Sequence, residues 1–185
     1  MVMPKVERRY TAAEVRQFPE DGNRYELIRG VLQVSPAPAP RHQIVVRRLS
    51  RVLDDYFEGL ARGDTLFALP ADISWDDETL VQPDLLVVPP EEVTNSWASY
   101  RTLLLAVEVL SPSSVRRDRV DKRRLYQENR VGTYWIVDHE AGLVEVWGPD
   151  DERPEIVTDA LTWRVQPDGP EIRIDLAGLF ERLPE

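Results

Sequence analysis

Residues 103–110 read Leu-Leu-Leu-Ala-Val-Glu-Val-Leu, so a single carboxylate, Glu108, interrupts an otherwise apolar run. A run of this kind predicts a strand that is covered on both faces, as in the centre of a sheet. Residues 85–88 have the same character and directly follow Asp84. A basic segment and a third apolar run, residues 134–138, come next along the chain. The sequence therefore predicts two central strands that each carry one acid, followed by a helix and another strand.

The N-terminal part of the chain predicts a short helix and a hairpin. Residues 11–14 form a capping box, which predicts a helix that ends before Pro19. Residues 24–34 predict a β-hairpin with Gly30 in its turn. Residues 35–40 contain three prolines, which favours an extended connector.

Residues 42–60 predict a long amphipathic helix. Its apolar residues recur at spacings of three and four, which places them on one face against a core. They are Val45, Leu49, Val52, Leu53, Tyr56, Phe57 and Leu60. Two short strands are predicted to follow, at residues 66–69 and 72–75.

After the central strands, the sequence predicts a helix, a hairpin, two more strands and a short helix capped by Asp175. The helix is expected at residues 118–130, the hairpin at 133–147, and the two strands at 161–165 and 171–174. This order of hairpins around a strand–helix–strand unit predicts an α/β fold with a mixed β-sheet flanked by α-helices. We expect one domain over residues 1–185, with a core of about residues 10–180.

Composition limits the classes of function. The 185 residues carry a formal net charge of −10, which argues against a protein that coats nucleic acid through bulk electrostatics. The chain has no cysteine, so disulfides and thiolate metal sites are excluded and a cytoplasmic location is expected. No apolar run reaches the roughly 20 residues of a membrane span, and residues 1–10 lack the apolar region of a secretory signal.

The charges are unevenly distributed. Residues 111–130 contain seven basic residues and three acids, whereas residues 138–185 contain 13 acids and four arginines. A second basic cluster consists of Arg41, Arg47, Arg48 and Arg51. This pattern fits either a basic face on an acidic protein or an ordinary solvated helix surface.

Asp84 and Glu108 are the first candidate site residues. Acids are almost never fully buried unless they are paired or bound to a metal, and Glu108 lies between Val107 and Val109. Two carboxylates near one end of central strands occupy the place where open α/β folds bind ligands. The alternative for each acid is a residue at the end of a strand that points to solvent.

Carboxylate oxygens on adjacent strands suit Mg²⁺, which prefers oxygen ligands and keeps positions for water and phosphate. Such an ion can polarise a phosphoryl oxygen and activate a water. Lys122 could then stabilise charge on the phosphate or orient the water. On a regular helix it would share one face with Asp118, Leu125, Tyr126 and Asn129. The alternatives for Lys122 are a solvated lysine or an ion pair with Asp118.

Several short motifs together resemble one known family. They are Tyr25-Glu26-Leu27-Ile28-Arg29-Gly30, the proline-rich stretch before His42, Pro83-Asp84, Glu108-Val109-Leu110-Ser111-Pro112-Ser113-Ser114, Asp118, Lys122, Tyr126 and Tyr134-Trp135-Ile136-Val137-Asp138. The chain resembles the PD-(D/E)XK nuclease superfamily, and within it the bacterial "putative restriction endonuclease" family, long classed as a domain of unknown function. The resemblance extends from about Tyr10 to Phe180.

The resemblance implies a restriction-endonuclease-like fold and a Mg²⁺-dependent endonuclease that hydrolyses DNA, with Mn²⁺ as a substitute ion. It also implies a homodimer, whose two-fold symmetry would suit cleavage of both strands of a duplex. Asp84, Glu108 and the carbonyl of Val109 would bind the metal. The superfamily's lysine is expected two residues after Glu108, where this chain has Leu110. In the family that lysine is displaced to the following helix, where Lys122 matches it as the catalytic lysine.

The same resemblance makes Glu26 an accessory acid of the catalytic set. From the residues alone, Glu26 could instead point to solvent, because it lies in a strand between Tyr25 and Leu27. His42 could contact a phosphate or cap the long helix, although a structural role is favoured.

Two other functions compete with the nuclease. The first is a catalytically inactive nuclease-fold module for DNA binding or protein interaction, which the net charge of −10 favours. The second is a carbohydrate hydrolase with Asp84 and Glu108 as its acid/base pair. It is disfavoured because such sites use aromatic sugar platforms, and because it gives Lys122 no role.

Overall fold

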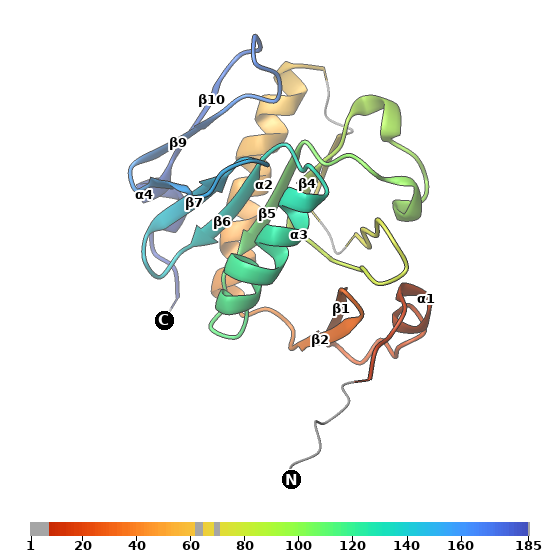
Figure 1. Cartoon of the computed structure of the whole chain (residues 1–185). Coiled ribbons are helices and arrows are strands. Elements are labelled where there is room, and N and C mark those ends of the chain that lie inside the picture. Colours follow the sequence, from red (N-terminus) through yellow and green to blue (C-terminus); the bar gives the residue numbers. More distant parts are fainter. Residues whose placement is uncertain (1–7, 62–64, 69–70, 185) are drawn as a thin grey trace.

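The computed structural model of the chain describes residues 8–61, 65–68 and 71–184. Its centre is a mixed sheet of six strands in the order β3-β4-β5-β6-β7-β8, with helices against both faces (Figure 1). The strands are β3 (Leu66–Phe67), β4 (Leu85–Val87), β5 (Leu105–Val109), β6 (Tyr134–Asp138), β7 (Leu143–Trp147) and β8 (Glu155–Val157). Only β5 and β6 pair in parallel; the other neighbours are antiparallel. The predicted α/β fold with a mixed sheet flanked by helices is confirmed.

The side chains of β5 alternate between the two faces of the sheet. Leu105 and Val107 belong to the apolar cluster beneath the long helix α2 (Pro40–Gly59), whereas Ala106 belongs to the cluster beneath α3 (Arg123–Glu128). Because successive side chains of a strand point to opposite faces, Glu108 faces α3. Every residue of β5 is buried, as the apolar run predicted.

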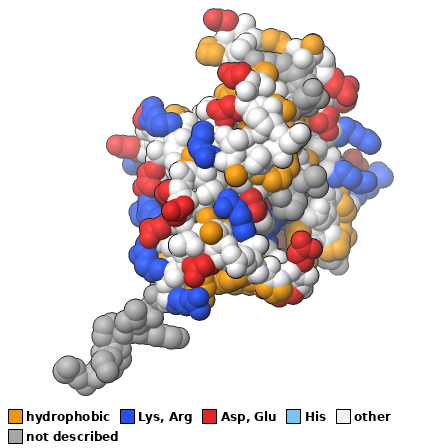
Figure 2. Space-filling view, turned by 90° about the vertical axis from the view of Figure 1, so that its right-hand side faces the viewer, with side chains coloured by type: hydrophobic (Ala, Val, Ile, Leu, Met, Phe, Trp, Pro, Cys, Tyr) orange, Lys and Arg blue, Asp and Glu red, His pale blue; other side chains and the backbone are white. Residues whose placement is uncertain are grey.

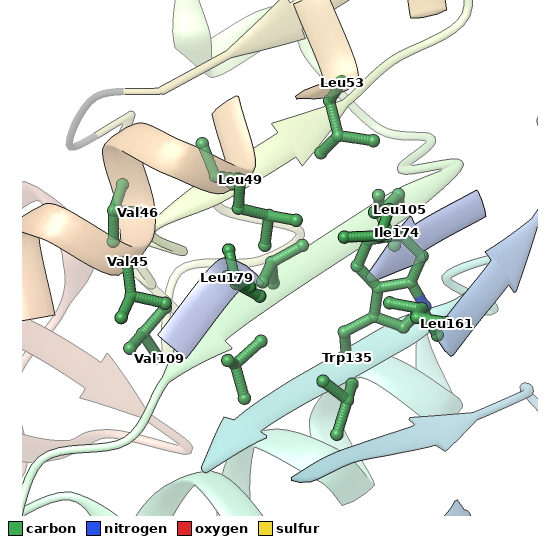
Figure 3. Close-up of a cluster of buried hydrophobic side chains, with 14 of the residues drawn as sticks. Val45, Val46, Leu49, Leu53, Leu105, Val109, Trp135, Leu161, Ile174 and Leu179 are labelled. Carbon is green, nitrogen blue, oxygen red and sulfur yellow. The ribbon is translucent and has the colours of Figure 1, made fainter. Parts of the chain in front are cut away.

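The α2 face of the sheet is covered mainly by apolar packing. Figure 3 shows side chains of α2, such as Leu49 and Val45, pointing toward side chains of the sheet. The strands β9 (Ala160–Trp163) and β10 (Ile172–Asp175) and the helix α4 (Leu176–Phe180) complete this layer. Burial of one such leucine contributes about 1.5–3 kcal/mol, so this layer is a major source of stability.

The other face is covered by the helical segment that links β5 to β6. It contains a π-helical turn, Arg117–Lys122, which continues into α3. A helix from residue 118 was predicted, but helical residues begin at 115 and the π-helical turn was not anticipated. The segment returns to the sheet at Gly132, where a Cβ would lie 2.8 Å from the carbonyl oxygen of Leu104. Glycine therefore permits the close approach of this segment to β5.

The N-terminal elements lie beside the sheet near the start of β4. The helix α1 (Ala12–Val15) begins with the predicted capping box at Thr11. The strands β1 (Arg24–Ile28) and β2 (Val31–Ser35) form the predicted hairpin, and Gly30 has a φ of 75° in its turn. This conformation favours glycine, which has no Cβ.

Some predicted boundaries differ from the structure. The prediction of a strand at residues 72–75 is wrong, because Ile73 forms only an isolated bridge with Val81. The strand β8 was missed because it is three residues long and largely exposed, so it has little apolar pattern. Residue 69, the end of another predicted strand, lies outside the described residues. No helix in the described part of the chain is long and apolar enough to cross a membrane.

Candidate active site

Asp84 and Glu108 meet at one edge of the sheet. Because β4 and β5 are antiparallel, the start of β4 lies beside the end of β5, and Asp84 directly precedes β4. Both acids line a pocket of about 230 Å³. Its walls are the proline-rich connector, residues 36–39, and the loop 111–114 that follows β5. The order of the strands thus brings the two predicted carboxylates to one pocket.

Asp84 is held by donors from three different elements. Its Oδ1 accepts hydrogen bonds from Arg24 Nη1 and Nη2, at 3.1 and 3.0 Å. Its Oδ2 lies 3.0 Å from His42 Nε2 and accepts a hydrogen bond from the Val109 N–H at 2.8 Å. Burial alone would raise the pKa of Asp84, but the His42 contact, the Arg24 charge and the Val109 N–H lower that pKa to about 2. Asp84 is therefore ionised at neutral pH.

Glu108 is bound by two side chains of the helical segment. Its Oε1 accepts hydrogen bonds from Lys122 Nζ at 2.6 Å and from the Tyr126 hydroxyl at 3.0 Å. Burial raises the pKa of Glu108 well above its usual range, and the charges of Asp118 and Asp84 add to this rise against the opposing effect of Lys122. A cation close to Glu108 would favour its ionised form.

Glu26 reaches the same cluster from the hairpin. Leu27, the next residue, exchanges backbone hydrogen bonds with Leu80, which fixes β1 beside the start of β4. Glu26 Oε1 lies 2.7 Å from Lys122 Nζ and accepts the Gln82 N–H at 2.8 Å. Although burial raises the pKa of Glu26, the charges of Lys122 and Arg117 overcome this effect and lower it. Glu26 is therefore a buried, ionised partner of Lys122.

Lys122 lies among three carboxylates and is fully buried. Its Nζ contacts Glu108 and Glu26 and lies 4.0 Å from Asp118 Oδ1. Burial would lower the pKa of Lys122, but these three negative groups raise it, so the ammonium stays charged. Lys122 does not line the pocket itself; Glu108 and Asp118 lie between its ammonium and the pocket.

The π-helical turn explains how two basic residues reach Glu26. Residues five apart lie on one side of a π-helix, whereas on a regular α-helix they would be turned by about 140° from each other. Arg117 and Lys122 are five apart, and Arg117 Nε lies 3.9 Å from Glu26 Oε2. The same Nε lies 3.6 Å from Asp118 Oδ1. The wide turn therefore directs both cations to the buried acids.

The structure brings all four predicted catalytic residues into one buried cluster. The alternatives in which Glu26, Asp84 or Glu108 points to solvent are wrong, because none of these residues is more than 6% exposed. The alternative of a solvated Lys122 is wrong for the same reason. Two positions face the pocket, Asp84 and Glu108, while Glu26 and Lys122 lie behind them.

Two residues with a place in the site were missed or underrated. The sequence assigns no role to Arg24, because an arginine at the start of a hairpin strand has no distinguishing pattern. The structure agrees with the structural role favoured for His42, whose Nε2 contacts Asp84 Oδ2, whereas the alternative of a helix cap is wrong because Ala39 is the N-cap of α2. Its position on the buried side of α2, one turn before Val45 and Val46, was the available signal.

The pocket offers donors that fit a magnesium ion. Asp84, Glu108 and Asp118 all line it, and their oxygens form the hard donor set that Mg²⁺ prefers. Asp118 Oδ1 is buried without a hydrogen-bond partner in the described structure, so it could accept from a water of the ion. Among the described residues, no three His, Asp or Glu side chains converge closely enough to hold a metal by themselves. An ion here would keep water or phosphate oxygens as ligands, as Mg²⁺ does.

Comparisons with known proteins agree with this fold. The model of the Uma2 family, described as "Putative restriction endonuclease", matches residues 12–177, so the chain belongs to this family. A crystal structure from Anabaena variabilis ATCC 29413, of "a putative nuclease belonging to DUF820", has a TM-score of 0.77 and 17% sequence identity. That match covers 94% of this chain and 99% of the other and shows a shared fold. No curated protein matches the chain. Membership of this family supports a nuclease.

Proposed function

We propose that the chain is a Mg²⁺-dependent endonuclease that hydrolyses phosphodiester bonds of DNA. The observation that carries this proposal is the convergence of Asp84 and Glu108 on one pocket, with Lys122 bonded to Glu108. Membership of the family supports the same reaction class. When bound, Mg²⁺ would polarise a phosphoryl oxygen and lower the pKa of a water.

Asp84 and Glu108 would hold the ion, with the Val109 carbonyl as a further ligand. His42 and the Val109 N–H keep Asp84 ionised and oriented. Arg24 now binds Asp84 Oδ1, and it also lines the pocket. It is therefore placed to bind a phosphate oxygen once the ion takes part of its contact with Asp84.

Lys122 would act as the catalytic lysine through its contact with Glu108. Lys122 Nζ donates to Glu108 Oε1, so it would orient this carboxylate toward an ion. The charge of its ammonium would also favour negative charge on a phosphate or orient an attacking water. Glu26 would be the accessory acid, because its Oε1 keeps a second contact with Lys122.

The test is cleavage of supercoiled plasmid and single-stranded circular DNA with Mg²⁺ or Mn²⁺. Asp84→Asn and Glu108→Gln should each lower the rate by at least about a hundredfold, because loss of an outer-shell partner alone costs ten- to a hundredfold. Asp150→Asn, at an exposed pair with Arg130, is the matched control and should keep the wild-type rate. Absence of cleavage by the wild type with either ion would refute the proposal.

The inactive nuclease-fold module for DNA binding or protein interaction is the alternative that the net charge favours. On the face shown in Figure 2, acidic and basic side chains are interspersed and form no continuous basic surface. Calorimetric titration with Mn²⁺ separates the two functions, because an inactive module has no need of an ion at Asp84 and Glu108. The carbohydrate hydrolase loses support, since it gives no role to Lys122, which is bonded to Glu108.

The homodimer stays a prediction. Light scattering of the purified protein at several concentrations measures its molar mass and therefore tests this prediction directly.

A further inference from the structure

A second and larger pocket adjoins the reaction pocket. Its volume is about 560 Å³, and it lies between the end of α1, the loop that leads to β1, and the start of α2. Arg24, Ala37 and Pro38 line both pockets, so the two share a wall. Apart from Arg24 on the shared wall, the proposed reaction gives no role to the residues that line this second pocket.

The shared wall is connected to the reacting carboxylates. Arg24 donates to Asp84 Oδ1, and it also lies 3.3 Å from the carbonyl oxygen of Gln82. The Gln82 N–H donates to Glu26, while the Gln82 side chain donates to Asp72 Oδ1 at 2.7 Å in the second pocket. A molecule in the second pocket would therefore lie directly beside the reaction centre.

The polar groups of the second pocket suit an uncharged ligand. Two arginines, Arg16 and Arg24, are balanced by Glu20 and Asp72, so the lining has no excess positive charge for a phosphate. It also contains the side-chain amides of Asn23, Gln43 and Gln82, which offer both donors and acceptors. Such groups can hydrogen-bond to the edge of a nucleobase or to a sugar hydroxyl.

Two aromatic rings complete the lining. Phe18 and Tyr25 pack edge to face at 5.1 Å, and both are only partly buried. Phe18 also packs against Tyr10 at 5.7 Å, while the Tyr25 hydroxyl donates to Asp21 at 2.7 Å. The rings are thus held in place and offer a surface on which a base can stack.

The size of the reaction pocket limits what can reach the metal ligands. The side chains of Asp84 and Glu108 are each 3% exposed, and the pocket of about 230 Å³ is below the usual range of about 300–1,000 Å³ for ligand pockets. It can take one phosphodiester group, but the adjoining nucleoside needs further space. The second pocket supplies that space at the shared wall.

We propose that the second pocket binds the nucleoside next to the scissile phosphate, so that the substrate is a single strand or an unpaired segment of DNA. The inference rests on the proposed function and names its substrate class. A base in this pocket cannot remain paired, because its edge would contact the amide side chains of the lining.

The experiment measures binding of a labelled single-stranded oligothymidylate by fluorescence anisotropy in EDTA, where no hydrolysis occurs. Asn23→Trp fills the pocket from an exposed position, and Phe18→Leu removes one stacking surface while keeping an apolar side chain. Both should raise the Kd about tenfold, as expected for loss of one stacked base. Gln17→Trp, an exposed position outside both pockets, should leave the Kd unchanged.

A second measurement separates this inference from the proposed function. Calorimetric titration with Mn²⁺ in the absence of nucleic acid reports the carboxylates of the reaction centre alone. Asn23→Trp should bind Mn²⁺ as tightly as Gln17→Trp does while it raises the KM for single-stranded DNA. Equal Kd values for Asn23→Trp and Gln17→Trp, or binding of duplex as tight as of single strands, would overturn the inference. Absence of DNA hydrolysis by the wild-type protein would instead refute the proposed nuclease function.

Discussion

The two faces of the central sheet are equally buried but hold very different side chains. On the α2 face, Leu49, Val107 and Trp135 are fully buried among apolar neighbours. On the α3 face, Lys122 and Glu108 are almost as completely buried, and both are ionisable. One strand, β5, contributes to both faces through alternate residues.

This contrast indicates that the α2 face mainly stabilises the fold, whereas the α3 face holds the reactive groups. Apolar burial stabilises the α2 face with no requirement for exact partners, whereas each buried charge on the α3 face is costly unless a partner compensates it. Replacement of a buried ionic cluster by apolar residues is often neutral or stabilising, so the cluster is not explained by stability alone. The α2 face is a scaffold that allows the α3 face to hold reactive groups.

The largest effect on stability is expected from Lys122→Met, which keeps the length of the side chain but removes the ammonium. Glu26 and Glu108 would then lose their common cation in a buried site. Breaking a buried ion pair by removing one partner costs about 3–5 kcal/mol. Urea unfolding at neutral pH measures this change in the free energy of unfolding.

Leu49→Ala on the opposite face is the matched comparison. It should cost about 3 kcal/mol through lost burial and a cavity, yet leave Mn²⁺ binding of the folded fraction unchanged. A cost below about 1 kcal/mol for Lys122→Met would show that the carboxylates do not depend on this cation.

A smaller effect is expected from the buried hydroxyl of Tyr126. Tyr126→Phe removes the donor to Glu108 Oε1 and should cost about 1 kcal/mol. Tyr25→Phe serves as the comparison, because its hydroxyl donates to Asp21 Oδ2 at an exposed position where water can replace it. The second change should cost less than about 0.5 kcal/mol. Equal costs in urea unfolding would contradict a special role for burial at Tyr126.

The smallest effect is expected at the outer edge of the α3 face. Burial alone would raise the pKa of Asp138, but the Ala141 N–H and Arg119 lower it below 3.8. A lowered pKa of an acid in the folded state stabilises the fold above the unfolded value, and this contribution is lost as the pH falls through the folded value. Asp138→Asn should therefore cost about 0.5 kcal/mol at neutral pH and nothing measurable at strongly acidic pH. A cost that is independent of pH would contradict this assignment.

Much of the fold could be predicted because apolar periodicity follows directly from burial. The run at residues 103–110 gave a central strand, and the spacing along residues 42–60 gave α2, whose observed bounds are Pro40–Gly59. Asp175 caps α4 as predicted, because its side chain accepts from the Gly178 N–H. The strand β8 was missed because its exposed residues carry no such pattern.

The candidate site was partly predictable for the same reason. A carboxylate inside an apolar strand is conspicuous, so Glu108 could be found from its neighbours. Arg24 could not, because its contact with Asp84 joins residues 60 positions apart through the pairing of other segments. The position of Lys122 behind Glu108 depends on the π-helical turn, and over six residues the sequence cannot distinguish the wider π-helical repeat from the α-helical period of 3.6.

That π-helical turn determines how the chain tolerates changes in length. Removal of one residue between Arg117 and Lys122 would allow an ordinary α-helix to form over the same span. Arg117 and Lys122 would then be four positions apart, which on an α-helix turns them by only about 40°, so both would still lie on one side. The π-helical turn thus accommodates one more residue than an α-helix without redirecting the two cations. The same deletion between Lys122 and Tyr126, in the regular helix, would instead turn Tyr126 by about 100° away from Glu108.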